Sequence, residues 1–152
     1  MVRLNLGCGD YKLPGYINCD IRKEVNADLY FDILNSIPLN DESVEEVVAT
    51  EFLEHFGWRD EIKKVLAEIT RVLKRGGSAY FETPNLRKHC EAYLSLPYER
   101  GVEFIYGGQR SPYDVHKSGF GAESLKNLLL NYFSDVSVEE KDYSLVAKCK
   151  KA

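Results

Sequence analysis

The chain has 152 residues, of which 44% are hydrophobic and 29% are charged, and its formal net charge is −4. This length suits one domain with a sizeable core, and the acidic balance gives no electrostatic reason to expect nucleic acid binding. No apolar run approaches the roughly 18 residues that span a membrane, no signal segment is recognisable, and the four cysteines form no C-x-x-C pair. We therefore expect a single, reduced, cytoplasmic domain without membrane contact and without a bound metal ion.

Seven stretches rich in β-branched and aromatic residues, several of them bounded by turn residues, predict β-strands. They span residues 2–6, 16–21, 28–33, 44–50, 78–84, 136–140 and 144–150. Apolar residues recur at helical spacing in 59–75, which Gly76-Gly77 would terminate, and in 122–133. Strands interleaved with helices predict an α/β sheet with parallel members. The last two strands are joined by a few residues around Lys141-Asp142, which permits only an antiparallel hairpin.

Residues 85–120 form the one long stretch without a predicted strand or helix. Loops of this length inside a compact domain are usually functional or disordered. Gly101, Gly107 and Gly108 lie within it and can absorb the backbone changes of a closing motion. We therefore expect residues 85–118 to form a mobile lid over a substrate site, within one domain of residues 1–152.

The sequence "LNLGCGD", residues 4–10, places Gly7 and Gly9 where an apolar strand ends. In open α/β sheets this is where ligands bind, and glycine allows close approach to the main chain, although a tight turn also explains two glycines. A dinucleotide-binding fingerprint needs a third glycine, a helix and an acid about 20 residues on. Here Pro14-Gly15 prevent a long helix and the acid, Asp20, follows Gly9 by only eleven residues. The pattern disfavours NAD and fits a ligand with a ribose but no phosphates, because Asp20 could accept hydrogen bonds from both ribose hydroxyls. The alternative role for Asp20 is to cap a helix or a turn.

These motifs resemble the class I S-adenosylmethionine-dependent methyltransferases, and in particular a compact bacterial and archaeal group with an "LNLGCG…GYINCD" opening. The resemblance extends nearly end to end, through "FDILNSIPLNDESVEEVVATEFLEHF", "EIKKVLAEITRVLKRGGSAYFETPN" and "HKSGFGAESLKNLLLNYF". It implies a Rossmann-like sheet, mostly parallel with an antiparallel terminal strand. It also implies S-adenosylmethionine as cofactor and methyl transfer as the activity.

Carried over position by position, the resemblance implies a set of cofactor-binding residues. They are Gly7, Cys8 and Gly9 beside the methionine part, Asp20 and Ile21 at the ribose and adenine, Asp32 and Ile33 at the adenine edge, and Glu51 near the sulfonium. One position departs from the pattern. Many members carry Asp or Glu two residues before the first glycine, where this chain has Asn5, and a neutral side chain would support the loop more weakly.

In methyl transfer from a sulfonium the cofactor carries the reactive group, and the protein mainly positions the acceptor in line with the methyl group. A general base is needed only where the acceptor must lose a proton. His116, beside Tyr113 and Asp114, is the candidate base or acceptor ligand, with bracing of the loop as the alternative. The stretch after the fourth strand, "TEFLEHF", lacks the motifs of DNA methylases. We expect a small-molecule acceptor. Two alternatives stay open: a non-catalytic cofactor-binding or assembly module, and an aminopropyltransferase on the same fold.

The links between the first four strands are each about ten residues or fewer, whereas a parallel crossover with a helix normally needs a dozen or more. The two predicted helices follow the fourth and fifth strands, and in the methyltransferase fold these cover the same face of the sheet. The opposite face should therefore have reduced helix content. We expect that the 85–118 lid or a second copy of the chain, in a homodimer, covers this face.

Overall fold

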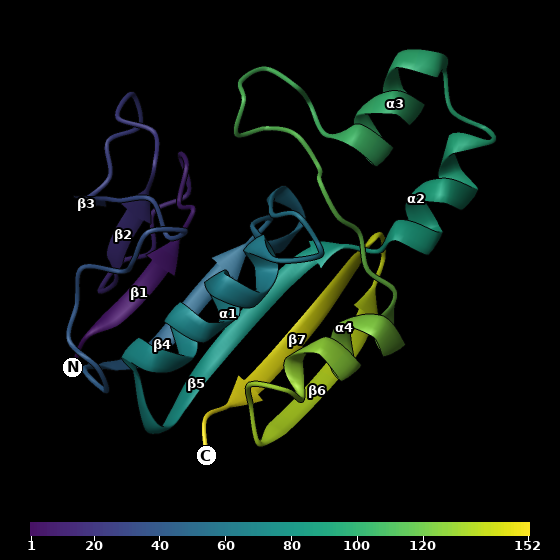
Figure 1. The fold of residues 1–152 in the computed structure, drawn as a ribbon. Helices are drawn as coiled ribbons and strands as arrows, with labels where there is room; N and C mark the ends of the chain where they lie inside the picture. Colours follow the sequence, from purple (N-terminus) through teal and green to yellow (C-terminus); the bar gives the residue numbers. More distant parts are fainter.

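The computed structural model describes residues 1–152 and contains one seven-stranded sheet (Figure 1). The strands are β1 (Arg3–Leu6), β2 (Ile17–Asp20), β3 (Leu29–Tyr30), β4 (Val44–Thr50), β5 (Leu73–Pro84), β6 (Asp135–Lys141) and β7 (Ser144–Lys150). Their order is β3-β2-β1-β4-β5-β7-β6. Neighbours from β3 to β5 pair in parallel, and β7 runs antiparallel to both β5 and β6. The predicted mixed α/β sheet of a class I methyltransferase is confirmed.

Four α-helices and one 3-10 turn complete the fold. They are η1 (Leu53–His55), α1 (Glu61–Val72), α2 (Leu86–Tyr93), α3 (Tyr98–Tyr106) and α4 (Ala122–Leu129). Helix α1 ends earlier than predicted, because the fully buried Leu73 already pairs with Val44 as the first residue of β5. Gly76-Gly77 therefore lie inside β5, at the irregularity where the β4–β5 register shifts, and do not end the helix. None of the helices has the length and apolar character needed to cross a membrane.

The core lies between one face of the sheet and two helices. Helix α1 buries the face formed by Ile62, Val65, Leu66 and Ile69, and α4 buries Leu125 and Leu129. Strands β1, β4 and β5 contribute Leu4, Leu6, Val47, Ala49 and Phe81 from alternate positions. Burying an aliphatic side chain of this kind stabilises the fold by about 1.5–3 kcal/mol.

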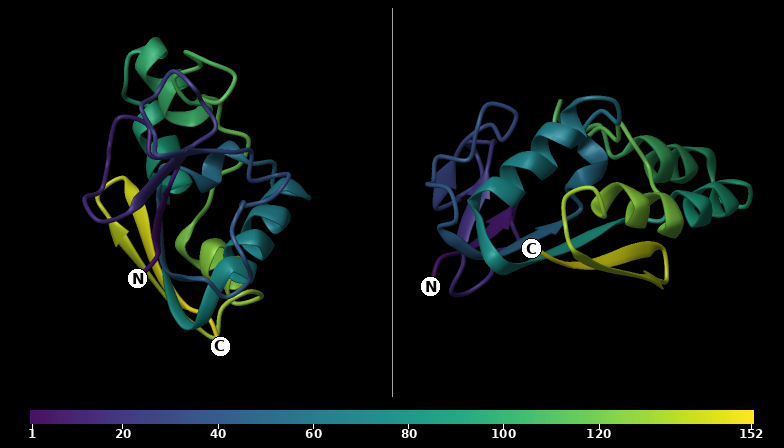
Figure 2. Two further views of the ribbon diagram at one scale, coloured as in Figure 1. Left: turned by 90° about the vertical axis from the view of Figure 1, so that its left-hand side faces the viewer. Right: turned by 60° about the horizontal axis from the view of Figure 1, so that its bottom comes forward.

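The opposite face of the sheet carries no helix. In Figure 2 (right), α1 and α4 lie on the same face, and no helix lies on the other. Arg3, Tyr16 and Glu46 form a polar cluster there: the Arg3 guanidinium lies over the Tyr16 ring, and the Tyr16 hydroxyl donates to Glu46 at 2.8 Å. A cavity of about 350 Å³, bordered by Tyr80 and Lys148, continues this surface. The predicted reduction of helix content on one face is confirmed.

The prediction of an irregular segment at 85–120 is wrong in part, because α2 and α3 lie within it. The Asn85 side chain caps α2 by accepting from the Lys88 amide, and the two helices pack at Gly101, where a Cβ would approach Tyr93 to 2.6 Å. No residue of α2 is buried, so the apolar periodicity that identifies a helix is weak. The segment lies beyond the carboxyl end of β5 (Figures 1 and 2) and does not cover the open face.

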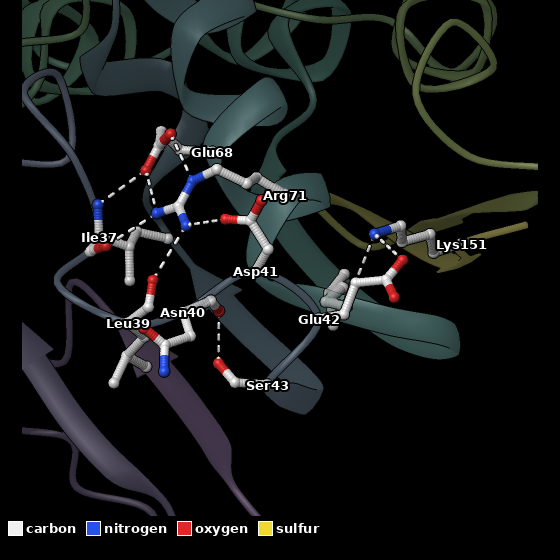
Figure 3. A network of polar contacts seen from close by, with 10 residues as sticks. Ile37, Leu39, Asn40, Asp41, Glu42, Ser43, Glu68, Arg71 and Lys151 are labelled. Atoms are coloured by element: carbon white, nitrogen blue, oxygen red, sulfur yellow. Dashed lines mark hydrogen bonds and ion pairs between the residues drawn. The ribbon is translucent and has the colours of Figure 1, made fainter.

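A polar network takes the place of a crossover helix between β3 and β4 (Figure 3). The Arg71 guanidinium on α1 donates to the carbonyls of Ile37 and Leu39, both at 2.9 Å, and to Asp41 at 2.7 Å. Glu68 accepts from Arg71 and from the Ile37 amide, each at 2.8 Å. The loop that follows β3 is thereby held against the helix.

Candidate functional site

Parallel strands bring the ends of β1, β2, β4 and β5 to one edge of the sheet. At this edge Gly7 and Gly9 adopt left-handed backbone angles, with φ of 63° and 48°. A Cβ on Gly7 would lie 2.5 Å from the Phe52 ring, and one on Gly9 would lie 3.2 Å from the Arg22 guanidinium. Both positions thus require glycine for conformation and Gly7 also for space.

Asp20 is buried at the end of β2 and is held by the glycine turn. Its Oδ2 accepts from the Gly9 amide at 2.9 Å and from Arg22 Nη2 at 3.3 Å, and its Oδ1 accepts from the Arg22 amide at 2.9 Å and Nε at 3.2 Å. Burial favours the neutral acid, but the hydrogen bonds from Arg22 and Gly9 outweigh it and hold the pKa of Asp20 below its usual range. Asp20 is therefore a preformed carboxylate. Arg22 did not emerge from the sequence; its signal is a basic residue two positions after the acid.

Asn5 is buried and braces the loop that follows the glycine turn. Its amide donates to the Tyr11 carbonyl and to Asn18 Oδ1, both at 2.9 Å. Asn18 Oδ1 also accepts from the Leu13 amide at 2.8 Å. Contrary to the weaker support expected of a neutral side chain, the donor of Asn5 meets two acceptors that a carboxylate could not satisfy.

The remaining predicted cofactor residues lie along the same edge. Cys8 is buried and its amide donates to the Cys19 carbonyl, while Ile21 is half-buried next to Asp20. The β2–β3 pairing brings Tyr30 beside Asp20, and two residues later the Asp32 carboxylate accepts from the Leu34 amide at 2.9 Å. Ile33 is part of the main core, so its side chain is committed to packing.

The turn after β4 holds two neighbouring carboxyl groups. Glu51 has a positive φ of 49° and lies at the surface, and partial desolvation raises its pKa. Glu54 in η1 is 1% exposed; its Oε2 accepts from the Thr83 hydroxyl at 2.9 Å, and its Oε1 has no partner. Burial, with Glu51 as a second cause, raises the pKa of Glu54 to about 8.

Two histidines lie beside Glu54. His55 Nδ1 is 3.1 Å from the Val115 carbonyl, its Nε2 is 3.9 Å from Glu54 Oε1, and its ring centroid is 5.3 Å from that of His116. Burial and the neighbouring His55 lower the pKa of His116, which favours a neutral imidazole at pH 7. The structure brings His116 to the β4 end of the edge, whereas sequence reasoning treated it apart from Glu54 and His55.

Comparisons with known proteins agree with this arrangement. Residues 17–81 match a family model described as a methyltransferase domain. A solved SAM-dependent methyltransferase of Thermotoga maritima, described as a possible histamine N-methyltransferase, has a TM-score of 0.72 at 16% identity, covering 99% of this chain and 82% of that one. A protein of Pyrococcus horikoshii OT3 has a TM-score of 0.68 at 18% identity, covering 99% of this chain and 81% of that one. A SAM-dependent methyltransferase of Archaeoglobus fulgidus has a TM-score of 0.66 at 17% identity, covering 98% of this chain and 85% of that one. No curated protein matches significantly in sequence.

A glycine turn after β1, an acid after β2 and a single reversed strand, β7, define the class I methyltransferase fold, and the solved structures support it at the level of fold. The match over residues 17–81 is to a methyltransferase domain, and the solved structures with the same fold include SAM-dependent methyltransferases; a domain of this class implies S-adenosylmethionine as its cofactor.

Proposed function

We propose that this chain transfers a methyl group from S-adenosylmethionine to a small-molecule acceptor in the cytoplasm, with Gly7, Cys8, Gly9 and Asp20 as the centre of the cofactor site. The observation that supports this most directly is the ionised, buried Asp20 hydrogen-bonded to the Gly9 amide at 2.9 Å. A carboxylate and bare main chain at adjacent strand ends suit a ribose and its attached thioether chain. The four cysteines are free, which agrees with a reducing compartment.

Asp20 must exchange partners to hold a ribose. A carboxylate offers about four acceptor sites, and the four contacts from Gly9 and Arg22 use them. The Arg22 side chain supplies two of these contacts and is 31% exposed, so it can turn into solvent. We infer that the two ribose hydroxyls replace Arg22 Nε and Nη2.

The other positions complete the proposed site. Ile21, Asp32 and Ile33 would border the adenine, with Ile33 contributing main chain because its side chain is in the core, and Glu51 would line the sulfonium end. The cofactor, when bound, supplies an electrophilic methyl group, and the chain positions the acceptor in line with it. His116, neutral at pH 7, faces the acceptor in this proposal and can take a proton.

Calorimetric titration with S-adenosylmethionine and with its demethylated product tests the cofactor site. We expect binding in the low-micromolar range or weaker. Because charge-assisted hydrogen bonds contribute roughly 1.5–3 kcal/mol each, Asp20→Ala should weaken binding at least about tenfold. Arg22→Ala, which frees two acceptor sites on Asp20, should not weaken it.

Asp60→Ala, at an exposed carboxylate that makes no capping hydrogen bond, is the matched control and should bind as the unaltered chain does. The proposal fails if neither ligand gives heat, or if Asp20→Ala, shown to be folded by circular dichroism, binds with unchanged affinity. A chain that binds the cofactor but turns over none of a panel of small-molecule amines, phenols and carboxylates would favour the non-catalytic module.

A further inference from the structure

A buried carboxyl group with one oxygen that lacks a hydrogen-bond partner lies just after the carboxyl end of β4. Glu54 is almost fully buried, yet only one of its oxygens, Oε2, is bonded, to the Thr83 hydroxyl. Oε1 has no hydrogen-bond partner in the protein. Buried polar atoms nearly always have a partner, so Oε1, which has only the Glu51 carboxyl and the His55 ring near it, is a position where an ion or a water molecule can bind.

Two imidazoles are directed at the same place. The nearest ligand atoms of Glu54, His55 and His116 all lie within 4.8 Å of one another. Because a carbonyl can only accept, the 3.1 Å contact to Val115 places the proton of a neutral His55 on Nδ1 and leaves the lone pair of Nε2 free. A ring nitrogen anchored on a backbone carbonyl, with the other nitrogen free, is the usual arrangement of a metal-binding histidine.

Main-chain hydrogen bonds hold the two parts of this cluster together across the sequence. The amides of Lys117 and Ser118 donate to the Glu54 carbonyl at 2.8 and 3.1 Å, and the His116 amide donates to Tyr106 at 3.0 Å. The three side chains are thus positioned by the backbone on both sides. Ligands of one transition-metal ion lie about 2.0–2.2 Å from it, so a shift of about 1 Å in these side chains would close the site.

We propose that Glu54, His55 and His116 bind a divalent transition-metal ion such as Zn²⁺. Two imidazoles and one carboxylate favour a borderline metal over Mg²⁺ or Ca²⁺. Three protein ligands leave a coordination position open. Phe52, which packs on Gly7, lies two residues before Glu54, so the ion would lie at the cofactor edge of the sheet. With the ion bound, His116 is a ligand and cannot also accept the acceptor's proton, so the ion would replace it at the acceptor. That role rests on the proposed methyl transfer, whereas binding of the ion does not.

The test measures metal binding on the full chain with Cys90→Ser as background, because Cys90 is the one exposed thiol. After treatment with a chelator, Zn²⁺ is titrated calorimetrically and Co²⁺ is followed by its visible absorption bands. We expect one ion per chain. His116→Ala and Glu54→Gln should each weaken Zn²⁺ binding at least about tenfold and abolish the Co²⁺ bands.

His89→Ala is the matched control, since His89 is hydrogen-bonded to the Phe104 carbonyl and is not part of the cluster. Glu54→Gln keeps the size of the side chain and an oxygen for Thr83, so it remains informative if His116→Ala does not fold. Absence of Zn²⁺ binding at millimolar concentration, or equal binding in Glu54→Gln and the parent, would overturn the proposal. S-adenosylmethionine binding is measured in the same variants. Loss of metal with retained cofactor separates this site from the proposed function.

Discussion

Asn5 shows how one amide organises the loop next to the proposed cofactor site. It donates to the Tyr11 carbonyl and to Asn18 Oδ1, and Asn18 cannot simply turn its amide because its Oδ1 also accepts from Leu13. The Asn18 amide nitrogen in turn donates to Asp28 at 3.0 Å. The two asparagines therefore connect β1, β2 and the strand that follows.

We expect Asn5→Asp to destabilise the protein by about 1–3 kcal/mol at pH 7, because it places a buried carboxylate against two acceptor oxygens and leaves the Tyr11 carbonyl without its donor. The loss should shrink as the pH falls, since a protonated Asp can donate again and burial raises the pKa of such a carboxyl group. Urea unfolding at pH 7 and near pH 4 measures both effects.

Asn40→Asp, at an exposed asparagine whose side chain makes no hydrogen bond, is the control and should unfold within about 0.5 kcal/mol of the parent. If Asn5→Asp matches this control at pH 7, Asn5 does not brace the loop.

At the scale of elements, α2 and α3 form a unit of their own. They pack on each other through Gly101 and Tyr93, and His89 stacks on Phe104. The unit joins the rest of the chain at its two ends, where Asn85 bridges Phe120 and the Val115 carbonyl contacts His55. His89 and Phe104 also pack on Tyr143 in the β6–β7 hairpin. A helical pair that packs on itself and has few contacts with the sheet can close as one body, so the predicted lid, residues 85–118, becomes a pair of helices rather than a loop.

We expect S-adenosylhomocysteine to slow tryptic cleavage after Arg110, whose side chain is 80% exposed in the segment between α3 and α4. Ligand binding at the neighbouring edge should restrict the opening that cleavage requires. Gel electrophoresis and mass spectrometry of the fragments measure the rate.

Cleavage after Arg75, which is exposed at the register irregularity near the start of β5, reports on a region outside the lid and should not change. Equal rates at Arg110 with and without ligand, at a concentration shown to saturate the site, would contradict a lid.

At the scale of the whole molecule, the helices lie on one face of the sheet and leave the other open (Figure 2). Of the two predicted covers, the 85–118 segment is ruled out by its position beyond the carboxyl end of β5. A second copy of the chain remains as the proposal. The open face offers Tyr16 and Tyr80 with Arg3 and Lys148 between β1 and β7, and aromatic and arginine side chains are typical of interfaces.

Multi-angle light scattering should therefore give a mass of about twice the 17.4 kDa of one chain. Tyr80→Glu, in the middle of the open face, should shift the protein toward monomer, because it adds a charge next to Glu82. Tyr98→Glu on α3, where the tyrosine is 72% exposed, should leave the mass unchanged. A monomer at all concentrations would show that this face stays in contact with water.

The sequence by itself determined the features that depend on local pattern. The strands at β1 and β7, the bounds of β4 and the hairpin at Lys141-Asp142 follow from strand composition and link length. Gly7, Gly9 and Asp20 could be placed together because parallel strands end at one edge. The hydrogen bonds of Arg22 to Asp20 are local in sequence, but no pattern in the sequence singled Arg22 out. The tertiary structure alone decided that Phe52 packs on Gly7. It also brought His116 to Glu54 and His55, which lie 62 and 61 residues before it in the sequence. These contacts join segments that are distant in sequence, and no local periodicity reports which exposed turn will fold back onto which strand end.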